Sequence, residues 1–240
     1  MDVLFLIDTS EGVSDLDFER EKNFIKTVVR SFKISSDHSR VGLMSYSNET
    51  EITVNFSDEQ SHDSLLERVE SLPFLGGQRQ FNNALETAAA QFFSPSGSSR
   101  SVVQKAAVII TNCDQVSTKG TDHLEESSLF QENDVKVLII AVGCDGADQE
   151  NNLQKLVQDA EQIFTPDSFE NLAAAAKRLT VVAADIAGSL TVFLYMDSEL
   201  SMAGCPKNQG RTNKIRLHLV SIECPLNVDV CSERVNCEPF

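Results

Sequence analysis

One short segment near the start of the chain carries side chains that could bind a metal ion. In the segment LIDTSEGVSD (residues 6–15), an apolar run ends at Asp8, and Thr9 and Ser10 follow directly. Proteins bind hard cations such as Mg²⁺ and Ca²⁺ through carboxylate, hydroxyl and carbonyl oxygens. Asp8 and Ser10 are therefore candidate metal ligands. From the residues alone, we favour the alternative that Asp8 caps the loop above the sheet.

No group of residues with the spacing of a catalytic site accompanies this segment. None of the histidines lies near a serine or cysteine that it could activate as a nucleophile: His38, His62, His123 and His218. The pair Gly76-Gly77 lacks a following Lys-Ser or Lys-Thr, which excludes a phosphate-binding loop. We expect that the protein is not an enzyme.

The charge balance limits the classes of partner. The 240 residues include 20 Lys and Arg but 36 Asp and Glu, a formal net charge of −16. Such a surface repels phosphate backbones and anionic lipids, so we expect neither nucleic acid nor membrane as a partner. The longest apolar stretch, residues 179–196, is interrupted by Asp185 and Gly188, which favours a helix followed by a strand over a membrane span.

The hydrophobic pattern predicts the elements that position Asp8. Continuous apolar runs predict buried strands at residues 3–7, 106–111 and 135–143, with a short strand at 162–164. A hairpin is predicted from strands at 41–47 and 51–56. Apolar residues at helical spacing predict helices near 14–32, 65–72, 81–92, 123–131, 153–157 and 166–188. Ser14 is the expected cap of the first helix, and the spacing of Asp167 and Glu170 predicts a capping box for the last.

This alternation predicts an α/β fold: a doubly wound, mostly parallel sheet with one antiparallel edge strand and helices on both faces. In such sheets, ligands bind beyond the carboxyl ends of the strands. The order of elements brings a set of polar and small residues to that edge: Asp8, Ser10, the Gly76-Gly77 loop, Asn112 and Cys144.

Several segments, in order, resemble a von Willebrand factor A (vWA) domain with its Rossmann-like fold. They are DVLFLIDTSEGVSDLDFEREKNFIKTVV, RVGLMSYSNETEITVNF, LPFLGGQRQFNNALETA, AAVIITN and VKVLIIAVG. The resemblance covers residues 1–187, which we assign to a vWA domain. The opening DTSEGV and the strand RVGLMSYS are most similar to the A domains of collagen type VI. The resemblance implies an extracellular adhesion or assembly module.

The family's metal-ion-dependent adhesion site combines Asp-x-Ser-x-Ser, a threonine on the glycine loop and an aspartate at the end of the fourth strand. Asp8 and Ser10 match this pattern. The second serine is replaced by Gly12, the loop threonine by Arg79 and the late aspartate by Asn112. We therefore expect a degenerate site that binds Mg²⁺ or Ca²⁺ weakly or not at all, because it has lost oxygens and one negative charge.

Three arrangements of Arg79 are open. Its guanidinium could pair with Asp8, so that a tethered cation replaces the metal, or it could be a solvated loop side chain or face a ligand. Asp114 could also substitute for the missing carboxylate. We favour the pairing with Asp8.

Six cysteines form two groups along the chain. In the strand order that the resemblance implies, Cys113 and Cys144 follow neighbouring strands, about 4.8 Å apart, so we expect them to form a disulfide. The others crowd the tail: Cys205, Cys224, Cys231 and Cys237. Their spacing lacks the close Cys-x-x-Cys pair of zinc modules. Residues 188–240 are thus predicted to form a small, disulfide-tied β segment, with a second copy of the domain as the alternative.

Two glycosylation sequons lie in one segment, at Asn48-Glu49-Thr50 and Asn55-Phe56-Ser57. Together with the even number of cysteines, they favour a secreted protein in an oxidising compartment. We expect a glycan at Asn48, which lies at the hairpin turn, and also at Asn55, where the strand end could partly cover it.

The function predicted from the sequence is protein–protein contact in the extracellular matrix. We expect partners among other matrix proteins or collagenous chains and no required cofactor. Because an apolar strand starts directly after Met1, we also expect the chain to be part of a larger multidomain protein. Two alternatives remain: a metal-dependent adhesion receptor domain, and an intracellular vWA scaffold with a zinc module. Divalent-ion dependence of binding separates the first from our choice, and zinc content separates the second.

Overall fold

The structure is a computed structural model of residues 1–240. It describes residues 1–112, 124–144, 153–154, 156–157, 162–172, 226–229 and 234–237. The chain divides into two units, residues 1–193 and 194–240. Within the described ranges, no helix is long and apolar enough to cross a membrane. The predicted domain boundary after residue 187 lies outside those ranges and stays a prediction.

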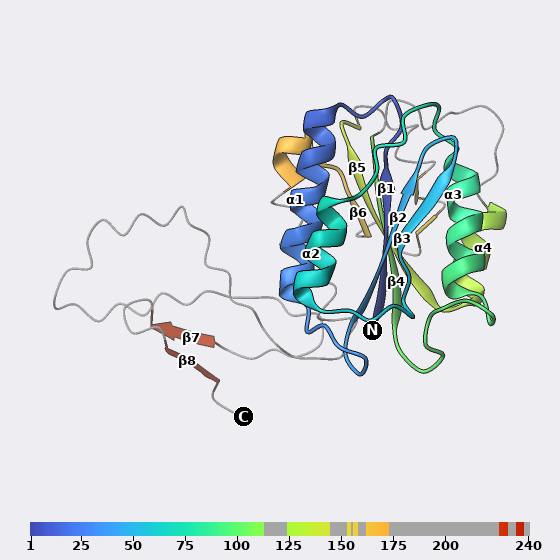
Figure 1. Ribbon diagram of the computed structural model, residues 1–240. Coiled ribbons are helices and arrows are strands. Elements are labelled where there is room, and N and C mark those ends of the chain that lie inside the picture. Colours follow the sequence, from blue (N-terminus) through green and yellow to red (C-terminus); the bar gives the residue numbers. More distant parts are fainter. Residues whose placement is uncertain are drawn as a thin grey trace. The chain divides into compact units, whose positions relative to one another are not determined.

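The first unit is built on a six-stranded sheet in the order β3-β2-β1-β4-β5-β6 (Figure 1). Its strands are β1 (Asp2–Asp8), β2 (Arg40–Tyr46), β3 (Thr50–Val54), β4 (Lys105–Asn112), β5 (Val135–Val142) and β6 (Ile163–Phe164). All neighbours pair in parallel except β2 and β3, which form the antiparallel hairpin. The predicted fold class is confirmed.

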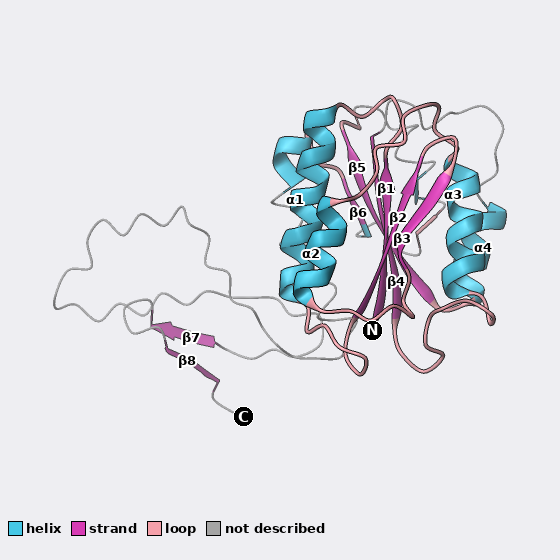
Figure 2. Ribbon diagram, in the orientation of Figure 1, coloured by secondary structure: helices cyan, strands magenta, loops and turns pink. Residues whose placement is uncertain are grey.

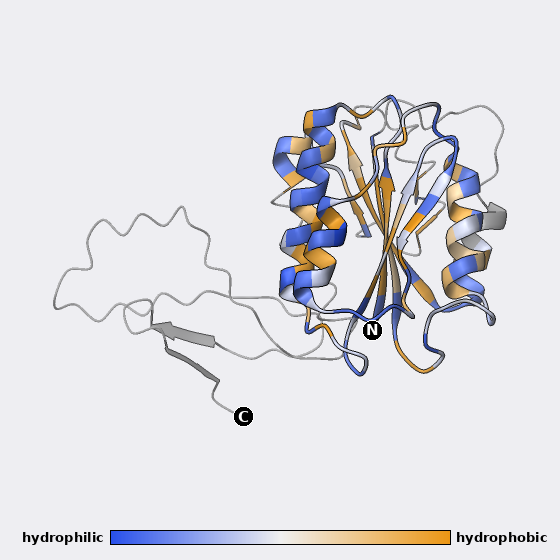
Figure 3. Cartoon of the chain, in the orientation of Figure 1, coloured by the Kyte–Doolittle hydropathy of each residue, from blue (hydrophilic) through white to orange (hydrophobic). Residues whose placement is uncertain are grey.

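Helices cover both faces of the sheet (Figures 1 and 2). α1 (Asp15–Ser31) and α2 (His62–Glu70) lie on one face, and α3 (Phe81–Ala88) and α4 (Leu124–Glu132) lie on the other. Alternate residues of β1 therefore enter two separate cores: Phe5 packs on the α1 side and Leu6 on the α3 side. Figure 3 shows the same pattern, with the most hydrophobic residues concentrated on the strands and on the helix faces turned toward them. Burial on both faces explains the continuous apolar runs of the sequence.

The ends of two helices test the predicted caps. Ser14 caps α1 as expected, because its hydroxyl accepts a hydrogen bond from the Asp17 backbone N–H at 3.2 Å. The capping box predicted at Asp167 and Glu170 is wrong. The chain there forms a short 3₁₀ helix, η4 (Phe169–Asn171), which follows Ser168 without a side-chain cap. Because the turn begins after Ser168, Glu170 is its second residue, and its carboxylate pairs instead with Arg20 Nη2 of α1 at 2.6 Å.

In the second unit, the structure describes one antiparallel pair, β7 (Leu226–Asp229) and β8 (Arg234–Cys237). Cys237 is the last residue of β8. The other tail cysteines, Cys205, Cys224 and Cys231, lie outside the described residues. The pairing of these cysteines therefore stays a prediction.

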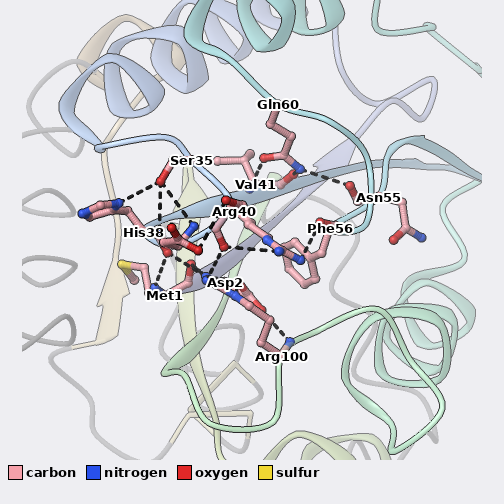
Figure 4. A network of polar contacts seen from close by, with 12 residues as sticks. Met1, Asp2, Ser35, His38, Arg40, Val41, Asn55, Phe56, Gln60 and Arg100 are labelled. Atoms are coloured by element: carbon pink, nitrogen blue, oxygen red, sulfur yellow. Dashed lines mark hydrogen bonds and ion pairs between the residues drawn. The ribbon is translucent and has the colours of Figure 1, made fainter.

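A buried ion pair fastens the amino end of β1, opposite the edge at which the parallel strands end (Figure 4). Asp2 is fully buried and pairs with Arg100, whose Nη2 lies 2.7 Å from Asp2 Oδ1. The Arg100 backbone N–H also donates to Asp2 Oδ2 at 2.7 Å. Arg100 Nη1 donates to the Ser36 carbonyl, and Nη2 also lies within hydrogen-bond distance of the carbonyls of Met1 and His38. One arginine thus joins β1, the loop before β2 and the loop before β4.

Conservative replacement of Arg100 tests this junction. Arg100→Lys keeps the charge but loses the planar fork of donors, so the free energy of unfolding should fall by about 1–3 kcal/mol. Arg100→Ala leaves Asp2 buried without its cation and should cost about 3–5 kcal/mol. Arg30→Lys, on the exposed side of α1, is the matched control and should change stability by less than about 0.5 kcal/mol. Urea denaturation measures all three, and equal effects of Arg100→Lys and Arg30→Lys would contradict the assignment.

Candidate functional site

The candidate site lies where the strand order reverses. β1 and β4 are neighbours at the centre of the sheet, and the chain leaves them in opposite directions along it. Open α/β sheets bind ligands in the crevice at this switch point, beyond the carboxyl ends of the strands. Asp8 ends β1 and Asn112 ends β4, so the fold brings these two predicted site residues to the crevice.

The loop after β1 is folded tightly against Asp8. The Ser10 backbone N–H donates to Asp8 Oδ1 at 3.0 Å, and the Thr9 hydroxyl donates to the Tyr46 carbonyl at 3.1 Å. Asp8, Thr9 and Ser10 are all buried. The Ser10 hydroxyl has no hydrogen-bond partner. The carboxylate is thus held inside the loop, beside a hydroxyl that could still serve a ligand.

The glycine loop brings Arg79 to the same place. Gly76 and Gly77 have φ values of +66° and +79°, a conformation that glycine adopts without strain. The Gly76 N–H donates to the Thr9 carbonyl at 2.8 Å, and the Glu11 N–H donates to the Gly77 carbonyl at 2.9 Å. The glycine loop and the loop after β1 are therefore fastened to each other, which fixes the position of Arg79.

Arg79 closes a ring of polar contacts over the crevice. Its Nε lies 2.5 Å from Asp8 Oδ2, in an ion pair without the direction of a hydrogen bond. Its Nη1 donates to the Asn112 carbonyl at 2.9 Å, and its Nη2 donates to Asn112 Oδ1. The Asn112 amide in turn donates to the Gly12 carbonyl at 2.7 Å. The expected pairing of Arg79 with Asp8 is present, and the backbone from Gly12 back to Asp8 closes the ring.

This donor set does not fit a divalent ion while Arg79 is in place. Asp8 Oδ1 accepts the Ser10 N–H, and Oδ2 lies against the guanidinium. Both oxygens of Asn112 accept hydrogen bonds from Arg79. A second cation would meet occupied oxygens and a positive charge beside the only carboxylate of the ring, whereas Mg²⁺ and Ca²⁺ need several free oxygens. Elsewhere in the described part of the chain, no three His, Cys, Asp or Glu side chains form a metal-binding cluster.

A buried acid lies close to this ring and was missed from the sequence. Glu21 on α1 is fully buried, and neither of its carboxyl oxygens has a hydrogen-bond partner. Burial raises the pKa of the Glu21 carboxyl well above its ordinary value; the negative charges of Asp8 and Asp17 raise it further, and Arg79 opposes them. The sequence contains a signal for this burial, because Glu21 lies three residues after Phe18 on the apolar stripe of the predicted helix.

The remaining predicted sites fall on different parts of the chain. Asn48 is exposed in the turn before β3, and Asn55 is half-buried directly after it. Cys144 follows β5, and β5 neighbours β4 as expected. Cys113 and Asp114 lie outside the described residues, so the Cys113–Cys144 disulfide stays a prediction. Glycosylation is likewise untested.

The sequence model of the von Willebrand factor type A domain matches residues 2–178. The chain belongs to this family. The human collagen alpha-6(VI) chain is 27% identical to this vWA chain over 186 residues, 77% of this chain and 8% of that one. Mouse integrin alpha-M is 26% identical over 178 residues, 71% of this chain and 15% of the integrin.

The vWA fold is also found among solved structures. Proximal thread matrix protein 1 from the mussel byssus has a TM-score of 0.68 at 20% identity, over 76% of this chain and 47% of that one. At this identity the likeness shows the fold alone. The chain spans between 7% and 21% of the length of the curated relatives that it matches.

The pH dependence of stability tests the buried acid. Because the pKa of Glu21 is raised above the value near 4.3 of an unfolded chain, the folded state holds its proton more tightly. This contribution to stability is complete below about pH 4 and is lost as the pH rises toward the folded-state pKa. Glu21→Gln removes the titration. Its free energy of unfolding, relative to the unmodified protein, should therefore rise with pH by up to about 1.4 kcal/mol per unit.

Chemical denaturation between pH 4 and pH 8 measures this difference. Glu67→Gln, on the exposed side of α2, controls for the loss of one surface carboxylate. A difference between Glu21→Gln and the unmodified protein that stays constant over this range would show that Glu21 is not a buried, protonated acid.

Proposed function

We propose that this vWA domain is an extracellular matrix module that acts by protein–protein contact and in which Arg79 replaces the metal ion. The observation that carries the proposal is the closed ring of Asp8, Arg79, Asn112 and Gly12. The family membership and the collagen and integrin relatives support an interaction and adhesion role. We expect secretion, and partners among matrix proteins or collagenous chains.

The ring determines how the site can contribute to binding. A bound metal ion keeps coordination positions that an oxygen of a partner could enter. The Arg79 side chain is only 3% exposed and holds Asp8 and Asn112, so it offers no comparable position. The role of the ring in this proposal is to hold the loops of the edge in one arrangement. Partners then bind the surface of those loops without a divalent ion.

The charge of the protein and its site chemistry support contact rather than catalysis. The net charge of −16 disfavours nucleic acid and anionic membranes as partners. Among the described residues, the site contains no nucleophile activated by a histidine, and its arginine is bound to Asp8 and Asn112. The relatives are much longer than this chain, which supports its being part of a multidomain protein.

A metal-dependent adhesion receptor domain is the second candidate. One relative is an integrin, and one solved structure of proximal thread matrix protein 1 is described with a zinc-occupied MIDAS motif, the metal-ion-dependent adhesion site. In this chain such a function would require Arg79 to leave Asp8. The third alternative, an intracellular scaffold with zinc, depends on tail cysteines of which three lie outside the described residues.

Titration calorimetry with Mg²⁺, Ca²⁺ and Mn²⁺ tests whether Arg79 replaces the metal. The unmodified protein should bind none of them with sub-millimolar affinity. The triple variant Gly12→Ser, Arg79→Thr, Asn112→Asp should gain binding, because it restores two hydroxyls and a carboxylate. The structure has room for the new serine, since a Cβ at Gly12 would lie 3.4 Å from Asn112 Nδ2 and 3.8 Å from Ser10 Oγ.

A matched triple variant carries Arg79→Lys instead of Arg79→Thr. It keeps a cation beside Asp8 and should not bind metal. Sub-millimolar binding by the unmodified protein would contradict the replacement of the metal by Arg79 and favour the receptor candidate.

Capture of matrix proteins tests the proposed mode of contact. The immobilised protein should retain the same partners from matrix extract with and without EDTA, because Arg79 and not a metal ion orders the edge. Loss of capture in EDTA, restored by added Mg²⁺, would support the metal-dependent candidate. The lysine-containing triple variant serves as the metal-free reference.

A further inference from the structure

The outer edge of β3 is open to pairing with another strand. β3 is the last strand of the sheet and pairs with β2 on one side only, as far as the described residues extend. Exposed strand edges present unpaired N–H and C=O groups and can associate with another chain. β3 has part of the usual protection, since its pairing with β2 is irregular between Leu43 and Met44 and Glu51 carries a charge, but Ile52 is 37% exposed.

The neighbouring parts of the sheet border are closed by the fold itself. Beyond the end of β3, the Gln60 side chain forms the backbone hydrogen bonds to β2 that a neighbouring strand would otherwise form (Figure 4). Its Oε1 accepts the Val41 N–H and its Nε2 donates to the Val41 carbonyl, both at 2.8 Å. At the opposite border, β6 has only two residues. The five residues of β3 are therefore the longest open edge in the described part of the sheet.

The two sequons lie at the two ends of this strand. Asn48 is exposed in the turn before β3, and its Oδ1 accepts the Ser47 hydroxyl at 3.0 Å. Asn55 directly follows β3, and its Oδ1 accepts the Ser57 backbone N–H and hydroxyl at 3.2 and 3.1 Å. Both side chains use Oδ1 in these contacts, whereas a glycan is attached through Nδ2. The folded chain is thus compatible with a glycan at each position.

We propose that N-linked glycans at Asn48 and Asn55 shield the edge of β3 and prevent a second copy of this chain from pairing with it. The inference rests on the secreted state that is part of the proposed function. Asn Nδ2 forms a bond to C1 of an oligosaccharide, the bond from C1 to its lipid diphosphate carrier breaks, and the amide loses a proton. The two asparagines are seven positions apart, at most about 25 Å of extended chain, so bulky glycans at both ends flank the whole strand.

Removal of the sequons tests the shield without removing the asparagines. Thr50→Ala and Ser57→Ala abolish both sequons and retain both asparagines, although Ser57→Ala also removes the hydroxyl that donates to Asn55 Oδ1. The full chain secreted from animal cells should lose mass at both sites on glycosidase treatment and sediment as a monomer. The double variant should approach twice the monomer mass as its concentration rises.

Charge at the edge identifies the surface that associates. Ile52→Lys, added to the double variant, should restore the monomer, because a lysine on an edge strand opposes pairing. Leu129→Lys is the matched control, since Leu129 is also 37% exposed but lies on α4. It should leave the association unchanged.

The inference is overturned if the secreted protein carries no glycan, if the double variant stays monomeric, or if Ile52→Lys and Leu129→Lys act alike. Capture of matrix proteins with and without EDTA, measured on the same preparations, separates this result from the proposed function. A double variant that stays monomeric and still captures its partners in EDTA would refute the shield alone. Failure of the chain to be secreted would refute the extracellular location as well.

Discussion

The buried ion pair between Asp8 and Arg79 is the interaction on which the site depends. A carboxylate at the end of the central strand has lost its water and would cost several kcal/mol without a compensating cation. Arg79 can supply that charge only because the glycine loop is hydrogen-bonded to the segment after β1 at both Gly76 and Gly77. Asn112 then uses its two oxygens to hold the other guanidinium nitrogens. The end of β1 with its loop, the glycine loop and the end of β4 are thus positioned by one charge.

The same balance explains the state of Glu21. The interior beneath the edge holds two carboxyl groups, Asp8 and Glu21, but one arginine contacts them, and it pairs with Asp8. Glu21 is left without a hydrogen bond and beside a negative charge. Its pKa is raised because an unpaired buried charge is far less stable than a buried neutral acid. The ring and the raised pKa of Glu21 thus both follow from the pairing of Arg79 with Asp8.

Local patterns in the sequence predicted most of the fold and the members of the ring, but not the contacts between distant segments. Apolar runs located β1, β4 and β5 because strands buried on both faces have no polar alternation. The resemblance aligned Arg79 with the loop threonine of the family's metal site, and the charge of Asp8 then favoured their pairing. By contrast, Arg100 meets Asp2 across 98 residues, and Arg20 meets Glu170 across 150. Such pairs follow from tertiary packing, which is why the local capping signal at Asp167 was misleading.

A site held by an arginine of the chain and a site held by a bound metal ion depend on different conditions. A bound metal stabilises the folded state by an amount that grows with its free concentration, so loop order and adhesion follow the ionic medium. Arg79 is part of the chain and is present at a fixed effective concentration, so its contribution does not vary with divalent ions. The arrangement requires ordering a long side chain, which costs about 2 kcal/mol of rotamer entropy, and two glycines held at positive φ. The loops at the carboxyl ends of the strands are then ordered without a bound ion, but the guanidinium of Arg79 is enclosed. In the proposed mode of contact, a partner recognises the shape and polarity of the surrounding loops, because the guanidinium of Arg79 occupies the oxygens of Asp8 and Asn112.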